Sequence, residues 1–174
     1  HRARPPGQRR RLMRRRQLLT LAAASCGGCG FELRRAPTLP FRSLALVGFA
    51  PASSVADALR LQLAASHVQV MEAPGRAEAV LEALTDAREK SVVASTSAGQ
   101  VREVQLRVRL RFRLATPAGR LLLAADELLL TRDMSYSETS ALAKAQEESL
   151  LYRAMEDDIV AQVLRRLSSI KLNA

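Results

Sequence analysis

The chain has 174 residues, a formal net charge of +10 and only 3% aromatic residues. Positions 1–25 hold eight arginines and no acidic residue, so the remainder carries +10 − 8 = +2. Because that remainder is not strongly basic and has few aromatic side chains to stack on bases, we expect no nucleic acid partner. About 145 residues are left, enough for one domain with a single core.

The first recognisable segment is a candidate export signal. Arg14, Arg15 and Arg16 precede a short apolar run over 18–24, and small residues follow that run. The run is far too short to cross a bilayer, which needs about 20 apolar residues. We therefore predict a lipoprotein signal over residues 1–28, with residues 1–12 lying upstream of a true start at Met13.

Cys26 and Cys29 lie at the end of this run, and the chain has no other cysteine. A disulfide framework is therefore not expected. A cysteine at the boundary of a signal is a candidate for acylation, which would place the processed chain on a membrane surface. The two cysteines compete, since only one can become the first residue.

Residues 29–43 include Pro37 and Pro40 and are predicted to form a tether to a single domain over 44–174. In the domain, residues 44–49 favour a buried strand. Ser54 and Asp57 fit a capping signal for a helix that ends near His67. The apolar residues of this helix repeat at intervals of four residues, at Val55, Leu59 and Leu63.

The remaining elements follow in order. Residues 68–71 begin an uncertain strand region, and residues 77–98 suit either a helix or, as we favour, one long bent strand. Residues 103–114 alternate strictly between apolar and polar, which predicts a half-buried antiparallel strand. Turn residues at 116–119 precede a returning strand over 121–131, and residues 141–170 have a helical pattern.

These elements predict an α+β fold in which two helices pack on one face of a four-stranded, mostly antiparallel sheet. The alternation places Leu106, Val108, Leu110 and Phe112 towards the helices. It places four arginines on the opposite face, namely Arg107, Arg109, Arg111 and Arg113. This row is either a solvated outer face or a cationic strip for phosphates or an acidic partner.

The sequence offers little material for catalysis. His67 is the one histidine outside the leader, which disfavours histidine-based metal sites and catalytic triads. The acidic pairs Glu147-Glu148 and Asp157-Asp158 are neighbours on a helix, where side chains diverge by about 100° instead of converging on a substrate. We expect no enzyme activity, no metal site and no cofactor.

Several motifs resemble the LPS-assembly lipoprotein LptE (RlpB) family. Gly30-Phe31-Glu32-Leu33-Arg34 follows a cysteine directly after the signal, as at the start of that family. Residues 99–106 (GQVREVQL), residues 141–144 (ALAK) with Glu147-Glu148, and residues 164–167 (LRRL) continue the resemblance. The family pattern, with its cysteine directly before Gly-Phe, selects Cys29 over Cys26 as the acylated residue.

The resemblance implies two helices on a four-stranded sheet, and a lipoprotein anchored on the periplasmic side of the Gram-negative outer membrane. It implies that the chain is a plug inside the β-barrel protein LptD and that the pair inserts lipopolysaccharide into the outer leaflet. The lysine of the ALAK motif, implicated in lipopolysaccharide contact, corresponds to Lys144. A basic residue of some members falls near Ser97, where this chain has none. The alternatives are an envelope scaffold lipoprotein that does not contact lipopolysaccharide and, disfavoured by the missing histidines, an exported hydrolase.

Overall fold

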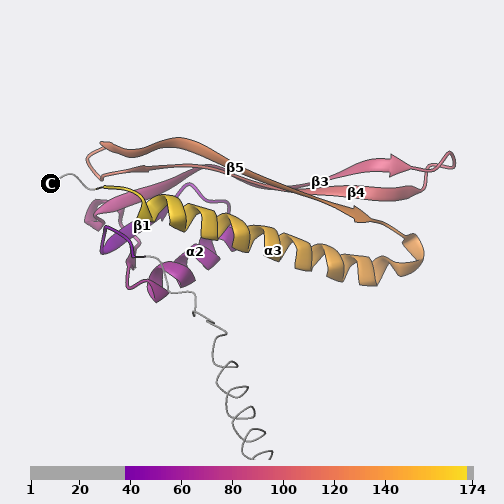
Figure 1. Cartoon of the computed structure of the whole chain (residues 1–174), viewed down its shortest axis with the longest axis horizontal. Coiled ribbons are helices and arrows are strands. Elements are labelled where there is room, and N and C mark those ends of the chain that lie inside the picture. Colours follow the sequence, from indigo (N-terminus) through magenta and orange to yellow (C-terminus); the bar gives the residue numbers. More distant parts are fainter. Residues whose placement is uncertain (1–37, 172–174) are drawn as a thin grey trace, which may run out of the picture. The chain divides into compact units, whose positions relative to one another are not determined.

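Two helices cover one face of a single sheet in the computed structural model, which describes residues 38–171 (Figure 1). The sheet has five strands in the order β2-β1-β3-β4-β5. They are β1 (Ser43–Val47), β2 (Gln69–Met71), β3 (Ala79–Ser95), β4 (Val101–Ala115) and β5 (Leu121–Ser135). The predicted α+β class with two helices is confirmed, whereas the predicted leader and both cysteines lie outside the described residues.

The prediction of four strands in a mostly antiparallel sheet is wrong. β1 pairs in parallel with both β2 and β3, and only β3, β4 and β5 are antiparallel to their neighbours. A helix follows β1, so the chain crosses over the sheet and returns in the same direction, which gives parallel pairing. The uncertain region after Val68 contributes a strand of its own, β2, whose three residues are too few for a clear periodicity.

The first helix, α2 (Ser54–Ala65), begins one residue earlier than its predicted cap. Its N-cap is Ser53, whose hydroxyl accepts a hydrogen bond from the Ala56 N–H at 3.1 Å. Asp57 does not reach back to the cap and instead pairs with Arg60 at 2.6 Å. The helix start is therefore stabilised as capping predicts, but by the neighbouring serine.

The predicted end of α2 near His67 is confirmed. His67 has a positive φ of 59°, and its N–H donates to the Ala64 carbonyl at 3.0 Å. The Val68 N–H donates to the Leu63 carbonyl at 2.9 Å, and both of these side chains are buried. This pair of bonds, with its apolar contact, satisfies carbonyl groups that the end of a helix leaves open.

The long strands give the molecule its extended form. Residues 79–95 form one strand, as favoured over a helix, and its pairing with β4 shifts register between Ala83 and Thr85. A strand of 17 residues spans about 56 Å at about 3.3 Å per residue. At one end of the sheet the β3–β4 turn, residues 96–100, lies beyond the last residues of β5 (Figure 1).

The core lies between the sheet and the helices. The predicted register of β4 is confirmed, because Leu106, Val108, Leu110 and Phe112 are at most 1% exposed while the intervening arginines are not buried. The second helix, α3 (Ala141–Ser168), runs along the sheet and follows a single 3₁₀ turn, η3 (Glu138–Ser140). Its predicted apolar ladder is buried at Met155, Ile159, Val163 and Leu167 and half-buried at Leu151.

Candidate functional site

Lys144 lies in the first turn of α3, as predicted, but it is not a freely solvated lysine. Its ammonium donates to the Ser135 hydroxyl at 3.0 Å and to the Glu147 carboxylate at 2.8 Å. The side chain is only 19% exposed. A cation is unfavourable near a helix N-terminus, and Glu147, one turn further along, offsets that cost.

The surroundings of Lys144 are built by the far ends of three elements. The Tyr136 N–H donates to the Arg102 carbonyl at 2.8 Å, which ties the β5–α3 connection to the start of β4. Lys90 on β3 lies 5.8 Å from the centre of the Tyr136 ring and pairs with Glu148 of α3 at 2.6 Å. Lys90 and Lys144 are thus both held by carboxylates of the first two turns of α3.

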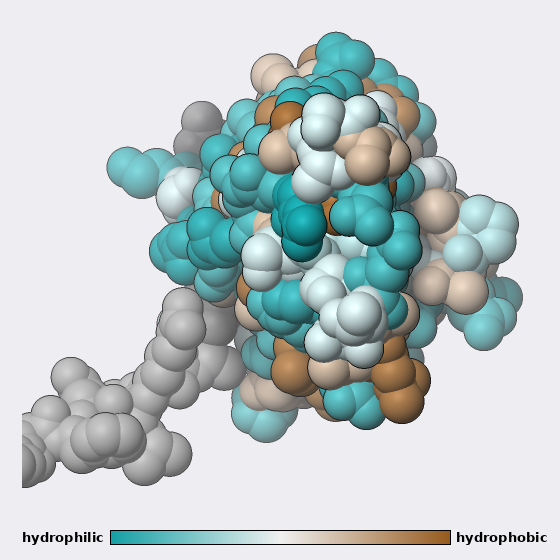
Figure 2. Space-filling view, turned by 90° about the vertical axis from the view of Figure 1, so that its right-hand side faces the viewer, coloured by the Kyte–Doolittle hydropathy of each residue, from teal (hydrophilic) through white to brown (hydrophobic). Residues whose placement is uncertain are grey.

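Figure 2 looks onto this end of the molecule, where hydrophilic residues surround a shallow hollow and apolar residues gather at the lower edge. Several apolar side chains of the adjoining elements are exposed, namely Val92 and Val93 on β3 and Leu142 and Leu150 on α3. Arg132, which the sequence suggested as an assistant to Lys144, is exposed on β5 opposite Leu106. No hydrogen bond joins it to Lys144 among the residues described. This end therefore combines amines with apolar side chains.

The arginine row on the outer face of β4 is less cationic than its sequence suggests. Arg113 pairs with Glu82 at 2.6 Å, and Arg107 donates to Gln105, which in turn donates to Asp133. Carboxylates on the flanking strands also lie directly across from two arginines, Glu89 from Arg107 and Glu127 from Arg111. The face has mixed charge, which fits the solvated outer face better than the cationic strip.

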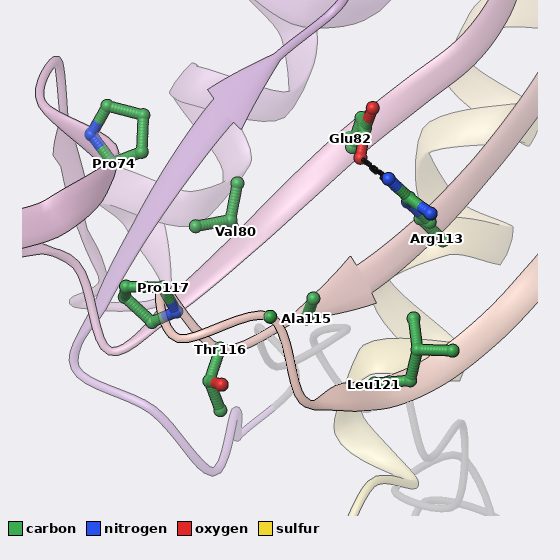
Figure 3. Close-up of a pocket in the computed structure, with 9 residues that line it drawn as sticks. Pro74, Val80, Glu82, Arg113, Ala115, Thr116, Pro117 and Leu121 are labelled. Carbon is green, nitrogen blue, oxygen red and sulfur yellow. Dashed lines mark hydrogen bonds and ion pairs between the residues drawn. The ribbon is translucent and has the colours of Figure 1, made fainter.

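A hollow of about 390 Å³ lies beside this face, near the β4–β5 turn (Figure 3). Val80, Ala115 and Leu121 give it an apolar lining, and the ion pair between Glu82 and Arg113 borders it. Both charges of the hollow are thus already paired. This leaves no charged side chain in it to orient a polar ligand.

The sequence analysis missed one buried ion pair. Glu156 of α3 is 3% exposed and accepts a hydrogen bond from Arg88 of β3, which also donates to the Ser54 hydroxyl at 2.7 Å. Burial raises the pKa of Glu156, and Arg88 counteracts this only in part. The available signal was the position of Glu156, between Met155 and Ile159 on the apolar stripe of α3.

The described residues give no support to other site types. No group of three or more metal-ligating side chains occurs within residues 38–171. In the same part of the chain, no helix is both long and apolar enough to span a membrane.

A family model described as LptE, lipopolysaccharide-assembly, matches residues 41–167. This range includes every strand of the sheet and nearly all of α3. The chain belongs to the LptE family. It is thereby a member of a lipoprotein family of lipopolysaccharide assembly, as the motifs predicted.

Two relatives named LPS-assembly lipoprotein LptE agree with this assignment. The protein from Yersinia enterocolitica is 27% identical over 153 residues, which are 86% of this chain and 73% of the relative. The protein from Pectobacterium atrosepticum is 25% identical over 156 residues, which are 88% of this chain and 84% of the relative.

Solved structures share the fold. The solution structure of lipoprotein B from Nitrosomonas europaea matches with a TM-score of 0.67 at 30% identity, over 80% of this chain and 91% of that one. The minor lipoprotein from Acinetobacter baumannii has a TM-score of 0.61 at 23% identity, over 75% and 93% of the two chains. The rare lipoprotein B from Shewanella oneidensis has a TM-score of 0.58 at 24% identity, over 72% and 94%. The last two support the fold alone.

Proposed function

We propose that this LptE-family chain is a lipid-anchored outer-membrane lipoprotein that works with the β-barrel LptD to place lipopolysaccharide in the outer leaflet. The observation that carries the proposal is the family match over residues 41–167. The candidate lipoprotein signal before the domain, with Cys29 or Cys26 at its end, supports the anchor on the periplasmic side. In this role the chain binds and positions its partners and catalyses no reaction.

Lys144 is our candidate for contact with the lipid. An ammonium has three N–H donors, and Ser135 and Glu147 take two of them. The third donor is available to a phosphate oxygen, and an ammonium binds phosphate as a point charge. Exposed Leu142, on the same turn of α3, offers apolar contact to an acylated sugar phosphate.

The second candidate function is an envelope scaffold that does not contact lipopolysaccharide. The ion pair between Lys144 and Glu147 favours it, because a lysine already neutralised by a carboxylate attracts an anion less strongly. The two functions differ in ligand binding, so one purification separates them.

The test is affinity purification of the full chain from outer membranes in mild detergent, followed by identification of co-purified protein and lipid. The proposed function predicts a large β-barrel and bound lipopolysaccharide. A β-barrel without lipopolysaccharide would support the scaffold, and recovery of neither would contradict both roles. An unrelated acylated lipoprotein of the same membrane, carried through the same purification, controls for lipid carried along by the detergent.

A further inference from the structure

β5 leaves one edge of the sheet open to a further strand. It is the last strand of the sheet, and no described strand pairs with its far side. The opposite edge is β2, which has only three residues and offers little backbone for pairing. From Asp126 to Ser135, β5 pairs with β4 without a register shift. A long and regular edge of this kind presents unpaired N–H and C=O groups to another chain.

The hydrogen-bond pattern fixes which residues face the open edge. The Tyr136 N–H donates to the Arg102 carbonyl, so this opposed pair is hydrogen-bonded. In an antiparallel ladder hydrogen-bonded pairs alternate, and the even-numbered residues of β5 therefore direct their backbone groups to β4. The odd-numbered residues direct theirs outwards, at Glu127, Leu129, Thr131 and Asp133.

A second antiparallel strand must therefore oppose these outward residues, and a second copy of β5 can do so in few registers. Centring the pair on Leu129 places Asp126 of each copy opposite Arg132 of the other, on the face that carries the helices. Centring it on Glu127 opposes that carboxylate to itself. Centring it on Leu130 opposes Glu127 to Asp133. Charge complementarity thus selects the register centred on Leu129.

We propose that two copies of this chain pair edge to edge through antiparallel β5 strands, with Leu129 on the two-fold axis. Leu129, 45% exposed in the single chain, then packs against its equivalent. The ladder bonds run between Glu127 of one copy and Thr131 of the other, and across the Leu129 pair itself. This inference stands apart from the proposed function, since it concerns the chain before any barrel partner is bound.

A cysteine at the axis tests the geometry directly. Opposed residues of a hydrogen-bonded pair have Cα atoms about 5.5 Å apart, which lies within the range that a disulfide bridges. Leu129→Cys in the full chain should give a disulfide-linked dimer on mild oxidation, several-fold above Leu142→Cys. Leu142 is 79% exposed but lies on α3, away from the edge. The unsubstituted chain measures the background from Cys26 and Cys29.

Charge reversal tests the register. Arg132→Asp should reduce the yield of the Leu129→Cys dimer, because it opposes two carboxylates. Adding Asp126→Arg should restore the yield, and circular dichroism should show all variants folded. The proposal fails if Leu129→Cys links no more than Leu142→Cys, or if the double reversal gives no recovery. Linkage to a different protein instead of a second copy would show that another strand occupies this edge, and would equally overturn self-pairing.

Discussion

Arg88 of β3 and Glu156 of α3 form an ion pair in which the carboxylate is buried and the guanidinium is 45% exposed. The same guanidinium lies 5.2 Å from the centre of the Tyr152 ring, and the Tyr152 hydroxyl donates to the Glu89 carbonyl at 2.9 Å. Burial of a carboxylate costs free energy unless it is paired, and Arg88 supplies that partner. The pair thus fixes the middle of α3 to the sheet.

Glu156 should make stability depend on pH. Its pKa is raised above the ordinary value of 4.5, so the folded chain binds this proton more tightly than the unfolded chain. The free energy of unfolding should therefore fall as pH rises from 4.5 through the raised pKa. Urea unfolding at several pH values should show this fall in the parent and its loss in Glu156→Gln. An identical slope in both proteins would contradict the assignment to Glu156.

The sheet register predicts a contrast between two leucines. Leu110 is 0% exposed under the helices, so Leu110→Ala should cost about 2–5 kcal/mol of unfolding free energy. Leu121, on the outer face, is 56% exposed, and Leu121→Ala should cost less than about 0.5 kcal/mol. Denaturant midpoints of the two variants measure both costs. Equal losses would show that the face assigned to β4 is wrong.

Gly48 is required by a close approach of the backbone. It has a φ of +76°, and a Cβ there would lie 2.3 Å from the Ala83 carbonyl oxygen. Gly119 has a similar φ of +89° but no atom within 4 Å of its would-be Cβ. Gly119→Ala should cost about 1–2 kcal/mol for the left-handed conformation, and Gly48→Ala should cost clearly more. Thermal unfolding of both variants separates conformational strain from the clash.

The sequence could predict the elements whose periodicity is long and regular. The alternation through 103–114 gave the correct face of β4, and the ladder from Met155 to Leu167 gave the buried stripe of α3. The three residues of β2 could not be predicted with confidence, because so short a strand has no measurable period. The assignment of the helix cap to Ser54 instead of Ser53 reflects the usual uncertainty of one residue when two serines are adjacent.

The candidate site was less predictable than the fold. The position of Lys144 followed from the sequence, but its bonds to Ser135 and Glu147 depend on how the β5–α3 connection turns. The neutralisation of the β4 arginines depends on cross-strand register, since Glu89 and Glu127 are far from them in sequence. A row of like charges on one strand therefore says little until its neighbouring strands are known.

Acylation of the leader is a prediction that mass spectrometry can check. We expect triacylation at Cys29, or at Cys26 in its place, and sorting to the outer membrane. A single acyl chain binds a membrane only marginally, so stable anchoring needs more than one. Glycine follows either cysteine, and not the aspartate that lipoprotein sorting reads as inner-membrane retention. Intact mass of the membrane-purified chain should identify the modified residue, and an unmodified N-terminus beginning elsewhere would refute the anchor.

Lys144 and Glu147 give opposite predictions for lipopolysaccharide binding. Lys144→Asp should weaken binding while the fold and the barrel interaction persist, because it removes the ammonium that meets phosphate. Glu147→Gln should strengthen binding, since it removes the carboxylate that competes for the same ammonium at 2.8 Å. Binding of the parent should also weaken as salt rises, because charges at a surface site are screened. Binding of labelled lipopolysaccharide to each purified variant at low and high salt measures these effects. If Lys144→Asp bound as tightly as the parent at low salt, Lys144 would be an ordinary structural lysine that stabilises the first turn of α3.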